Sequence, residues 1–556
     1  MIKMIKKTGS GIFLCMGLWA SIVNNGTAQN FPPVNITIYD SVATQGYYFM
    51  APYRSVPPYT YTHPLLILDR LGRIVFYRVF PGAGINITTS EDFKIQTDGR
   101  MTYFSRVLNY FCIMDSTFLV IDSANITNGF AIDMHDLQFL PNGHYLMLAK
   151  ESRYMNLTGY HWFGFNHTAP GSPDAEVIGV VIQEYDANKN LVWEWKGHDH
   201  FDFSDVDSVW LFSPSKVDWT HANAVEQDND GNILLCTRHF NEITKINRQT
   251  GNIIWRFGGK RNQFTFTNDP LQFNGQHDIR RLSNGHITIF DNGMYHDPPM
   301  ARALEYSLNE TSKTATLVWE YIFDSSMYSS ALGNFQVLEN DNRLIDFGAC
   351  PGNYPWMVVV KPDKSMIIEI SSPNDYTSYR AFNYDTLPWS FPRPGVDCHE
   401  SGGTFYLEAE EGHSSYKWST GATTRAIPVI NTGEYWVFVP LGNGFISSER
   451  IVVYDSTNPC LYLGTGSERT VSTVHLHCDP NPVSKEAWIT FDLPAPCQAS
   501  LTLTGLNGIT VFSIPSATYL AGHHRKRLDA SAIPRGIYFL HLRAGDHSVV
   551  QKLIVL

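Results

Sequence analysis

Three histidines stand at the same place in three copies of a repeated segment. His135, His221 and His277 each begin a run in which apolar and polar residues alternate on both sides of an Asn-Gly or Asp-Gly corner. Alternation around such a corner is typical of a β-hairpin. Repeats that share an axis bring equivalent positions together, so we expect the three imidazoles to meet at one site. Three histidines and a water molecule form a catalytic zinc set, and a cluster of imidazoles also suits an anion.

Arg238 favours the anion. It lies 17 residues after His221, just beyond the next expected strand of the same copy, from where it can point into the same site. A guanidinium repels a divalent cation, whereas its planar set of donors fits the oxygens of a tetrahedral oxyanion. We therefore expect no metal and no cofactor at this site. A structural role for Arg238 at the surface of the repeat is the alternative that its spacing leaves open.

The repeats also predict the fold that positions these residues. Each copy continues into a second alternating segment that ends on aromatic residues, as at 184–195, 245–257 and 305–321. Two hairpins per copy make a four-stranded unit, and repetition of such units indicates a β-propeller. Residues 29–396 fit five to seven blades, and we predict six. The first strand of each blade would line the central channel, with the histidines at one mouth and a turn two residues longer in the His221 copy.

Composition agrees with an all-β protein and excludes several functions. The 556 residues include 33 Phe, 28 Tyr and 13 Trp, and aromatic residues favour strands. Only 17% of the residues are charged and the net charge is −12, so we expect no binding to nucleic acid, which requires clustered Lys and Arg. No apolar run after the N-terminal segment reaches the length of a membrane-spanning helix.

A targeting segment is expected before the propeller and two small modules after it. Residues 1–28 combine lysines, a short apolar stretch and small residues, which is typical of a secretory signal peptide cleaved after Ala28. Short alternating strands around a tryptophan predict an Ig-like β-sandwich at 397–462. A further β-sandwich is expected at 474–556.

Cysteine usage agrees with export. Seven cysteines follow the signal segment, and an oxidising compartment permits disulfides. We expect the pairs Cys398–Cys460 and Cys478–Cys497 in the C-terminal modules. Because seven is odd, at least one cysteine stays free within the chain.

A series of short motifs, in order and at similar spacing, resembles the bacterial arylsulfate sulfotransferases. They are Met-His-Asp at 134–136, Asp-Trp-Thr-His-Ala-Asn at 218–223, Thr-Arg-His at 237–239, Ile-Trp-Arg-Phe-Gly-Gly at 254–259, Gln-His-Asp at 276–278 and Phe-Asp-Asn-Gly at 290–293. The resemblance covers residues 130–325. It implies a six-bladed propeller that moves a sulfuryl group from a phenolic sulfate ester to a phenolic acceptor, without a nucleotide donor or a cofactor.

The resemblance implies a role for each matching residue. His277 would be the nucleophile and form a sulfohistidine. His221, Arg238 and His135 would hold the sulfuryl oxygens and serve the phenolic oxygens. Neutral imidazole is nucleophilic near pH 7, and fixed donors stabilise charge on the oxygens of a group in transfer.

Other positions match less closely. Asn223 and His200 also match family positions and are candidates for contact with the substrate. His144 and His286 follow the Asn-Gly turns and are expected to be structural. Enteric-type members carry a long, disulfide-bearing insert ahead of the nucleophile, whereas segment 260–275 here is short and has no cysteine. Those members also have a separate N-terminal sandwich.

The C-terminal module resembles a second family. Pro-Asn-Pro at 480–482 and Gly-Ile-Tyr-Phe-Leu at 536–540 are similar to the C-terminal sorting domain of the type IX secretion route. This resemblance implies recognition by the type IX machinery and a location on the cell surface or outside the cell. Two other functions stay open: a non-catalytic surface propeller that binds a sulfated, phenolic or glycan ligand, and a metal-dependent hydrolase that uses the same histidines.

Overall fold

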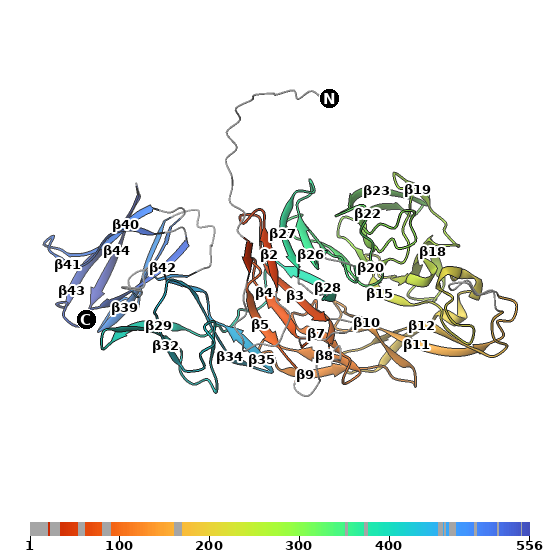
Figure 1. The fold of residues 1–556 in the computed structure, drawn as a ribbon, viewed down its shortest axis with the longest axis horizontal. Coiled ribbons are helices and arrows are strands. Elements are labelled where there is room, and N and C mark those ends of the chain that lie inside the picture. The colour runs from red at the N-terminus through yellow and green to blue at the C-terminus, as the bar shows by residue number, and fades with distance from the viewer. Residues whose placement is uncertain are drawn as a thin grey trace, which may run out of the picture.

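The computed structural model consists almost entirely of β-strands (Figure 1), which confirms the all-β class predicted from the sequence. It describes residues 20–22, 34–53, 62–80, 90–160, 170–350, 354–371, 376–453, 460, 463–465, 474–493, 497–519, 522–545 and 547–556. In these ranges the helical elements are short 3-10 turns: η1 (Gly197–Asp199), η2 (Phe203–Asp205), η3 (Ser208–Trp210) and η4 (Arg238–Phe240). None of these described turns is long or apolar enough to span a bilayer.

Five sheets are built from four consecutive antiparallel strands each. The first two contain β6 (Ser90–Ile95), β7 (Met101–Ser105), β8 (Tyr110–Met114) and β9 (Val120–Ala124), then β10 (Ala131–Phe139), β11 (Tyr145–Met155), β12 (Ala175–Tyr185) and β13 (Leu191–Lys196). The next two contain β15 (Ala222–Gln227), β16 (Ile233–Thr237), β17 (Glu242–Ile246) and β18 (Ile253–Gly258), then β20 (His277–Arg281), β21 (Ile287–Asp291), β22 (Arg302–Asn309) and β23 (Thr314–Tyr321). The fifth contains β24 (Asn334–Val337), β25 (Arg343–Asp346), β26 (Met357–Val360) and β27 (Met366–Ser371).

Additional short strands extend three of these sheets at their outer edges. β14 (Lys216–Asp218) pairs in parallel with β12, and β19 (Thr265–Thr267) pairs in parallel with β23. β2 (Asn35–Ile38) pairs with β27, and β1 (Ala20–Ile22) pairs with β2. β1 falls within the predicted signal segment, the rest of which lies outside the described residues.

The sixth sheet joins distant parts of the chain and closes a ring. Its innermost strand β28 (Thr377–Tyr384) pairs with β3 (Tyr47–Tyr53), which is followed outwards by β4 (Leu65–Leu68) and β5 (Ile74–Arg78). The innermost strands of the six sheets contact one another in a closed circle, in the order β6, β10, β15, β20, β24 and β28. This is the arrangement of a β-propeller. We interpret each of the six sheets as one blade.

Packing between the blades explains the aromatic composition. The inner strands are buried on both faces, as in β16, whereas the outermost strands β13 and β18 are partly exposed. Trp255 and Phe257 of one blade are completely buried against Tyr306 of the next. Large rings fill the wedge between two twisted sheets and bury a large apolar area in doing so.

The channel is filled with paired charges. Arg380 of β28 lies 3.0 Å from Asp92, 3.3 Å from Asp136 and 3.1 Å from Asp278, each on a different blade. Lys94 lies 2.8 Å from Asp92 and 2.7 Å from Asp136. Register shifts in the innermost strands, as between His277 and Arg280, place such residues at bulges of the ladder. Because each buried charge has an opposite partner, the network tolerates its desolvation.

The module after the propeller continues one of its sheets. β35 (Gly444–Ser447) pairs with β5, and β34 (Val437–Leu441) and β31 (Lys417–Trp418) extend the same sheet further. β29 (Val396–Ser401), β30 (Thr404–Ala409) and β32 (Ala426–Pro428) form a second small sheet, and β33 (Gly433–Tyr435), β36 (Ile451–Val453) and β37 (Leu463–Thr465) form a third. Trp418 is buried in the core that these strands share, as the sequence predicted for this module.

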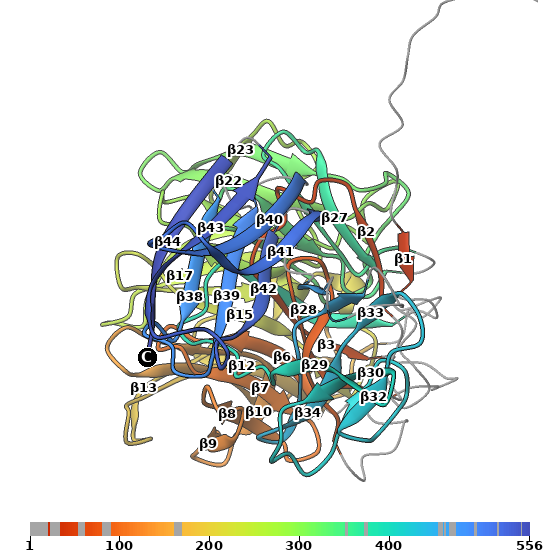
Figure 2. The same cartoon turned by 90° about the vertical axis from the view of Figure 1, so that its left-hand side faces the viewer.

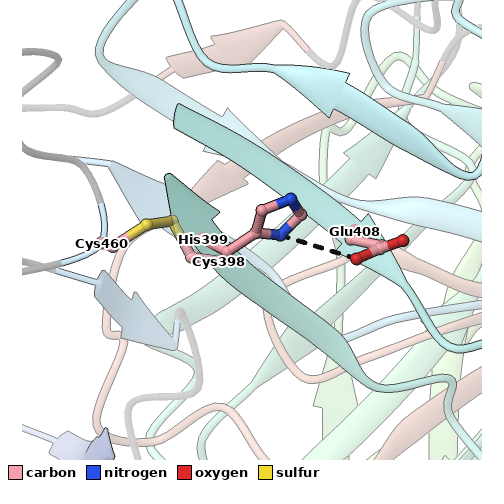
Figure 3. The surroundings of a disulfide bond; sticks show 4 residues. All are labelled: Cys398, His399, Glu408 and Cys460. Carbon is pink, nitrogen blue, oxygen red and sulfur yellow. Dashed lines mark ion pairs between the residues drawn. A yellow bond between two sulfur atoms is a disulfide. The ribbon is translucent and has the colours of Figure 1, made fainter. Parts of the chain in front are cut away.

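One predicted disulfide is present and the other is not. Cys398 of β29 is bonded to Cys460, next to an ion pair of 3.5 Å between His399 Nδ1 and Glu408 (Figure 3). The prediction of a Cys478–Cys497 bond is wrong, because both are free thiols. The two thiols belong to different sheets of the last module: Cys478 pairs with Ile489, and Cys497 pairs with Tyr519.

The last module is a two-layered sandwich of its own. One sheet contains β38 (His475–Asp479), β39 (Glu486–Leu493) and β42 (Gly522–Asp529), and the other contains β41 (Thr510–Tyr519), β40 (Cys497–Gly505), β43 (Gly536–Ala544) and β44 (His547–Val555). Both sheets contribute to one apolar core. This sandwich, coloured blue, lies at one end of the long axis of the molecule (Figure 1) and in front of the propeller when seen from that end (Figure 2).

Candidate active site

Two of the three predicted histidines are held by carboxylates. His221 Nδ1 lies 2.5 Å from Asp218 Oδ2 at the end of β14, and His135 Nδ1 is bonded to Asp133 Oδ1 in β10. Burial alone would raise the pKa of both carboxyls, but the adjacent histidines hold both values well below the ordinary range. Both carboxyls are therefore ionised at neutral pH. Each histidine then directs Nδ1 to a carboxylate and leaves Nε2 for another partner.

These two imidazoles lie side by side. The ring centroids of His135 and His221 are 5.2 Å apart, and those of His221 and His239 are 4.6 Å apart. His277 lies close enough for the charges of Arg238, His221 and His135 to lower its pKa. The structure thus brings His135, His221, His277 and Arg238 together.

The positions of the histidines in the repeat are not fully equivalent, however. In all three copies the hairpin is closed by the same short turn, in which a glycine N–H donates to the carbonyl three residues earlier: Gly143 to Leu140, Gly231 to Asp228 and Gly285 to Leu282. His135 and His277 lie five residues before the first residue of that turn, whereas His221 lies seven residues before it. The prediction of a longer turn is therefore wrong. The two extra residues place His221 just ahead of β15, with a positive φ of 41°.

His277 is the most enclosed of the three. It begins β20 and is 1% exposed. Its Nδ1 lies 2.7 Å from Asn292 Oδ1, and the Leu332 N–H donates to its Nε2 at 3.2 Å. The amide nitrogen of Asn292 donates to Ser329 Oγ and to the Leu332 carbonyl, each at 2.9 Å. The amide oxygen therefore faces His277, and because this oxygen only accepts, the imidazole proton is on Nδ1.

Burial keeps His277 uncharged. Desolvation lowers the pKa of His277 well below its ordinary value, and the positive charge of Arg238 lowers it further. At neutral pH the ring is a neutral imidazole whose Nε2 lone pair accepts from the Leu332 N–H, so attack by Nε2 requires that bond to break. The neutral ring is the state in which histidine acts as a nucleophile.

Arg238 has no carboxylate partner among the described residues. Its Nη2 donates to the Ser330 carbonyl at 2.6 Å, and its Nε is buried with no hydrogen-bond partner among those residues. Burial lowers the pKa of Arg238 to about 10, so the guanidinium stays charged at neutral pH. Burying an arginine without a carboxylate costs free energy unless an anion pairs with the guanidinium. The site is therefore suited to an anionic ligand.

Two further residues of the site were not recognised from the sequence. His239 donates from Nδ1 to the Asp218 carbonyl at 2.6 Å, and its Nε2 lies 3.5 Å from Arg238 Nη1. Trp210 stacks on His239 with centroids 4.7 Å apart, and Arg238 Cζ lies 4.1 Å from the Trp210 centroid. His239 is part of a motif that carried the family resemblance, but Trp210 lies in a loop outside the repeat, where the sequence pattern carries no signal.

Asn223 supports the site from behind. It is fully buried, and its Nδ2 donates at 2.8 Å to the carbonyl of Gln276, the residue before His277. Its own backbone carbonyl accepts from Arg380 Nη2 at 2.8 Å. Asn223 Oδ1 is buried with no partner among the described residues. Its hydrogen bonds are thus with the protein around His277.

His200 is separated from this group. It is exposed and stacks on Trp195 with centroids 4.8 Å apart, and Trp195 Nε1 donates to Gly251 in the turn between β17 and β18. The structure does not bring His200 to the other predicted site residues. His144 and His286 pair with glutamates of the adjacent strand, each at 2.7 Å, in keeping with structural roles.

Asp218, His221 and His239 bring potential metal-ligating atoms within 4.8 Å of one another. The Nδ1 atoms of both histidines, however, are engaged with Asp218, one with its carboxylate and one with its carbonyl. A cation here would break these bonds and lie beside the Arg238 guanidinium. The group therefore fits a hydrogen-bonded chain better than a metal centre.

A cavity of about 460 Å³ opens at the other end of the channel. It is lined by the hairpin turns, for example at Thr97, Pro141 and Asn229, and by Lys94 and Arg280 of the charge network. His221 lies just before β15 and His277 begins β20, at the ends of these strands away from the hairpin turns. This cavity is therefore distinct from the candidate site.

Fold and site together define a β-propeller with a cluster of histidines and an arginine that has no carboxylate partner among the described residues. The chain belongs to the arylsulfotransferase (ASST) family, whose model matches residues 40–381. A secretion system C-terminal sorting domain matches residues 479–556, which indicates export by the type IX route to the cell surface or beyond. No curated relative matches the chain.

Several solved structures are similar to this chain at low identity. A protein of unknown function from Bacteroides caccae is 9% identical, with 61% of this chain and 100% of that chain covered and a TM-score of 0.36. An inactive variant of virginiamycin B lyase from Staphylococcus aureus is 10% identical, with 68% and 96% covered and a TM-score of 0.32. The type IX secretion component PorZ of Porphyromonas gingivalis is 10% identical, with 94% and 91% covered and a TM-score of 0.18. We draw nothing further from these likenesses.

Proposed function

We propose that the protein moves a sulfuryl group from an aryl sulfate to a phenolic acceptor through a sulfohistidine on His277. The observation that carries this proposal is a neutral, buried His277 beside an arginine that lacks a carboxylate. The guanidinium of Arg238 has no carboxylate partner among the described residues and can pair with an anion. His277 supplies a lone pair on Nε2. A sulfate ester offers both a negative group and an electrophilic sulfur.

The transfer would occur in two balanced steps. In the first, His277 Nε2 attacks the sulfur, the bond from sulfur to the phenolic oxygen breaks, and that oxygen takes a proton from protonated His221 or His135. In the second, the same histidine takes the proton of the acceptor phenol, whose oxygen attacks the sulfur and releases His277. Burial lowers the pKa of His221, and the Asp218 carboxylate offsets part of that shift and so supports the protonated state that the first step needs. Arg238 would hold the equatorial oxygens of the group in transfer.

An aryl group has a suitable surface next to Arg238. Tyr295 packs edge-on against Trp210 with centroids 4.9 Å apart and is 40% exposed, and Phe212 is also next to Trp210 and 57% exposed. Exposed aromatic rings beside a buried charge suit a substrate with an aromatic ring and an anionic group. We include Asn223 as a residue that supports His277. For His200 we propose no contact with the substrate, since its ring lies against Trp195.

A chromogenic aryl sulfate with and without added phenol tests the proposal. Wild type should release the chromogenic phenol faster when an acceptor is present, and initial rates with both substrates varied should follow ping-pong kinetics. Without acceptor, one sulfuryl group should appear on the peptide that contains His277, and His277→Ala should show neither adduct nor turnover. An adduct on His221 or His135 would reassign the nucleophile. Binding of the ester without turnover would favour a non-catalytic surface propeller instead.

We further propose a division of the chain for export. The signal peptide would be cleaved after Ala28, the propeller would span 29–396, and an Ig-like module at 397–462 would connect it to the sorting domain at 474–556. Intact-mass analysis of the exported protein would test the cleavage site. A mature N-terminus inside β2 would contradict it.

A further inference from the structure

We infer that Asn292 is a positioning residue that holds His277 in its nucleophilic tautomer and keeps the sulfuryl adduct short-lived. The inference rests on the proposed function and concerns the state of the nucleophile. It starts from a difference among three histidines in one site: two are bonded to carboxylates and the third to an amide.

The hydrogen-bond partner of Nδ1 influences whether an imidazole is neutral or protonated. A carboxylate stabilises the protonated ring, and the Asp218 carboxylate does so for His221. His135 likewise has a carboxylate, Asp133, on Nδ1. The amide oxygen of Asn292 accepts a hydrogen bond from Nδ1–H of His277. Because this oxygen carries no charge, it does not favour protonation of Nε2. The charged and titratable groups that face His277 are Arg238, His221 and His135, and each opposes a positive ring. Asn292 therefore completes an environment for a neutral nucleophile.

The orientation of Asn292 is fixed from the far side. Its amide nitrogen has two acceptors, Ser329 Oγ and the Leu332 carbonyl, so a flipped amide would lose both bonds. Asn292 lies just after β21, and its neighbour Phe290 pairs with His277 across the ladder. The amide therefore reaches His277 from an adjacent strand and is held rigidly there.

The same partner sets how readily the adduct reacts. After Nε2 has bonded to sulfur, the ring keeps its Nδ1 proton and is positively charged, so the leaving group in the second step is a neutral imidazole. A carboxylate at position 292 would take the Nδ1 proton when the adduct forms. The leaving group would then be an imidazolate, which is a much stronger base and departs more slowly. A neutral amide thus keeps the second step fast.

Asn292→Asp and Asn292→Ala test this, with Ser329→Ala as the matched control. Each purified protein is pulsed with an aryl sulfate and freed of donor, and the loss of the adduct is followed by intact mass with and without phenol. We expect Asn292→Asp to form the adduct but to discharge it to phenol about 100-fold more slowly, the lower end of what proton control contributes to transfer. Ser329→Ala removes one of the two far bonds of the amide and the Ser329 bond to the Ala331 carbonyl, but it keeps the amide oxygen on His277 and the bond to the Leu332 carbonyl. Its adduct lifetime should therefore stay close to that of wild type.

A second measurement reports the tautomer directly. The ¹⁵N spectrum of labelled imidazoles should place the His277 proton on Nδ1 in wild type and in Ser329→Ala. Asn292→Ala should show a larger share of the Nε2 tautomer, because only the Leu332 N–H then opposes it. Discharge of the adduct at the wild-type rate in Asn292→Asp, or a proton on Nε2 in wild type, would overturn the inference. If wild type forms no adduct, the proposed function fails instead, and the spectrum still decides the tautomer. Should Asn292→Asp not fold, Asn292→Ala carries the test.

Discussion

The guanidinium carbon of Arg238 lies 4.1 Å from the centroid of the Trp210 ring. Trp210 is 3% exposed and takes the place that a carboxylate occupies beside most buried arginines. A ring face stabilises a cation without neutralising it, and this interaction is worth on the order of 2 kcal/mol when desolvated. Arg238 is therefore held in place while its charge remains available to a ligand.

Loss of the Trp210 ring should weaken the site at a distance from the chemistry. We expect Trp210→Leu to lower kcat/KM for an aryl sulfate by about tenfold, because the guanidinium loses its support. Trp210→Phe keeps an aromatic face and should retain most of the activity. Steady-state kinetics on both variants, with thermal unfolding as the check on folding, would measure this. Equal losses in the two variants would indicate a packing role alone.

Substitution of Arg238 by lysine should be severe although the charge is kept. Lysine provides a point charge and cannot offer two parallel donors to the sulfuryl oxygens. We expect Arg238→Lys to reduce turnover on the order of 10²-fold, the scale of one lost transition-state donor. Single-turnover phenol release would report it. Near-normal turnover would place Arg238 outside the transition-state contacts.

The pH dependence of the first step should depend on Asp218. Burial lowers the pKa of His221, and the Asp218 carboxylate offsets part of that shift. Asp218→Asn removes the offset, so the pKa of His221 should fall further. A step that needs protonated His221 is lost as pH rises through this pKa, so its alkaline limb should move to lower pH.

Two donor esters provide the control for this pH shift. Phenyl sulfate has a basic leaving group and needs the proton, whereas 4-nitrophenyl sulfate needs it much less. Rapid-quench release of phenol across pH should therefore show a shifted limb for the first ester in Asp218→Asn, and a smaller change for the second. An unshifted limb for phenyl sulfate would assign the acid to His135.

The pairing of β35 with β5 predicts where the chain can be shortened. A protein ending at residue 396 exposes the β5 edge, and an unpaired edge strand lowers stability and invites association between copies. We expect residues 29–396 to unfold at a temperature several degrees below that of residues 29–462 and to self-associate. Scanning calorimetry with light scattering would compare them. Removal of residues 480–556 should leave the unfolding temperature of the propeller unchanged.

The sequence alone predicted the features that depend on local periodicity. Alternation around Asn-Gly corners predicted the hairpins of β10 and β20, and repetition predicted that His135 and His277 lie near each other. The partners of these side chains were harder to find when they come from other elements. Asn292 contacts His277 from the next strand, and its second bond reaches Leu332 in the loop before β24. A sequence motif contains such residues, but their contacts become known only when the pairing of the strands is known.

Errors arose where the chain departs from its own repeat. His221 resembles the other two histidines in sequence, yet it is displaced by two residues because the hairpin turn has a fixed length. Cys478 and Cys497 are close in sequence, but they enter two different sheets.

Strand β28 closes the ring of blades by pairing with β3. It joins residues near 380 to residues near 50, the longest loop that this propeller must close, and such pairings form late because their entropy cost comes first. Its Arg380 simultaneously contacts Asp278, the neighbour of His277, and the carbonyl of Asn223. Closure of the ring therefore also completes the surroundings of the nucleophile. Sulfuryl transfer by this chain would therefore show that the ring of blades is closed. An exported chain with an open ring would contain every site residue but would be inactive.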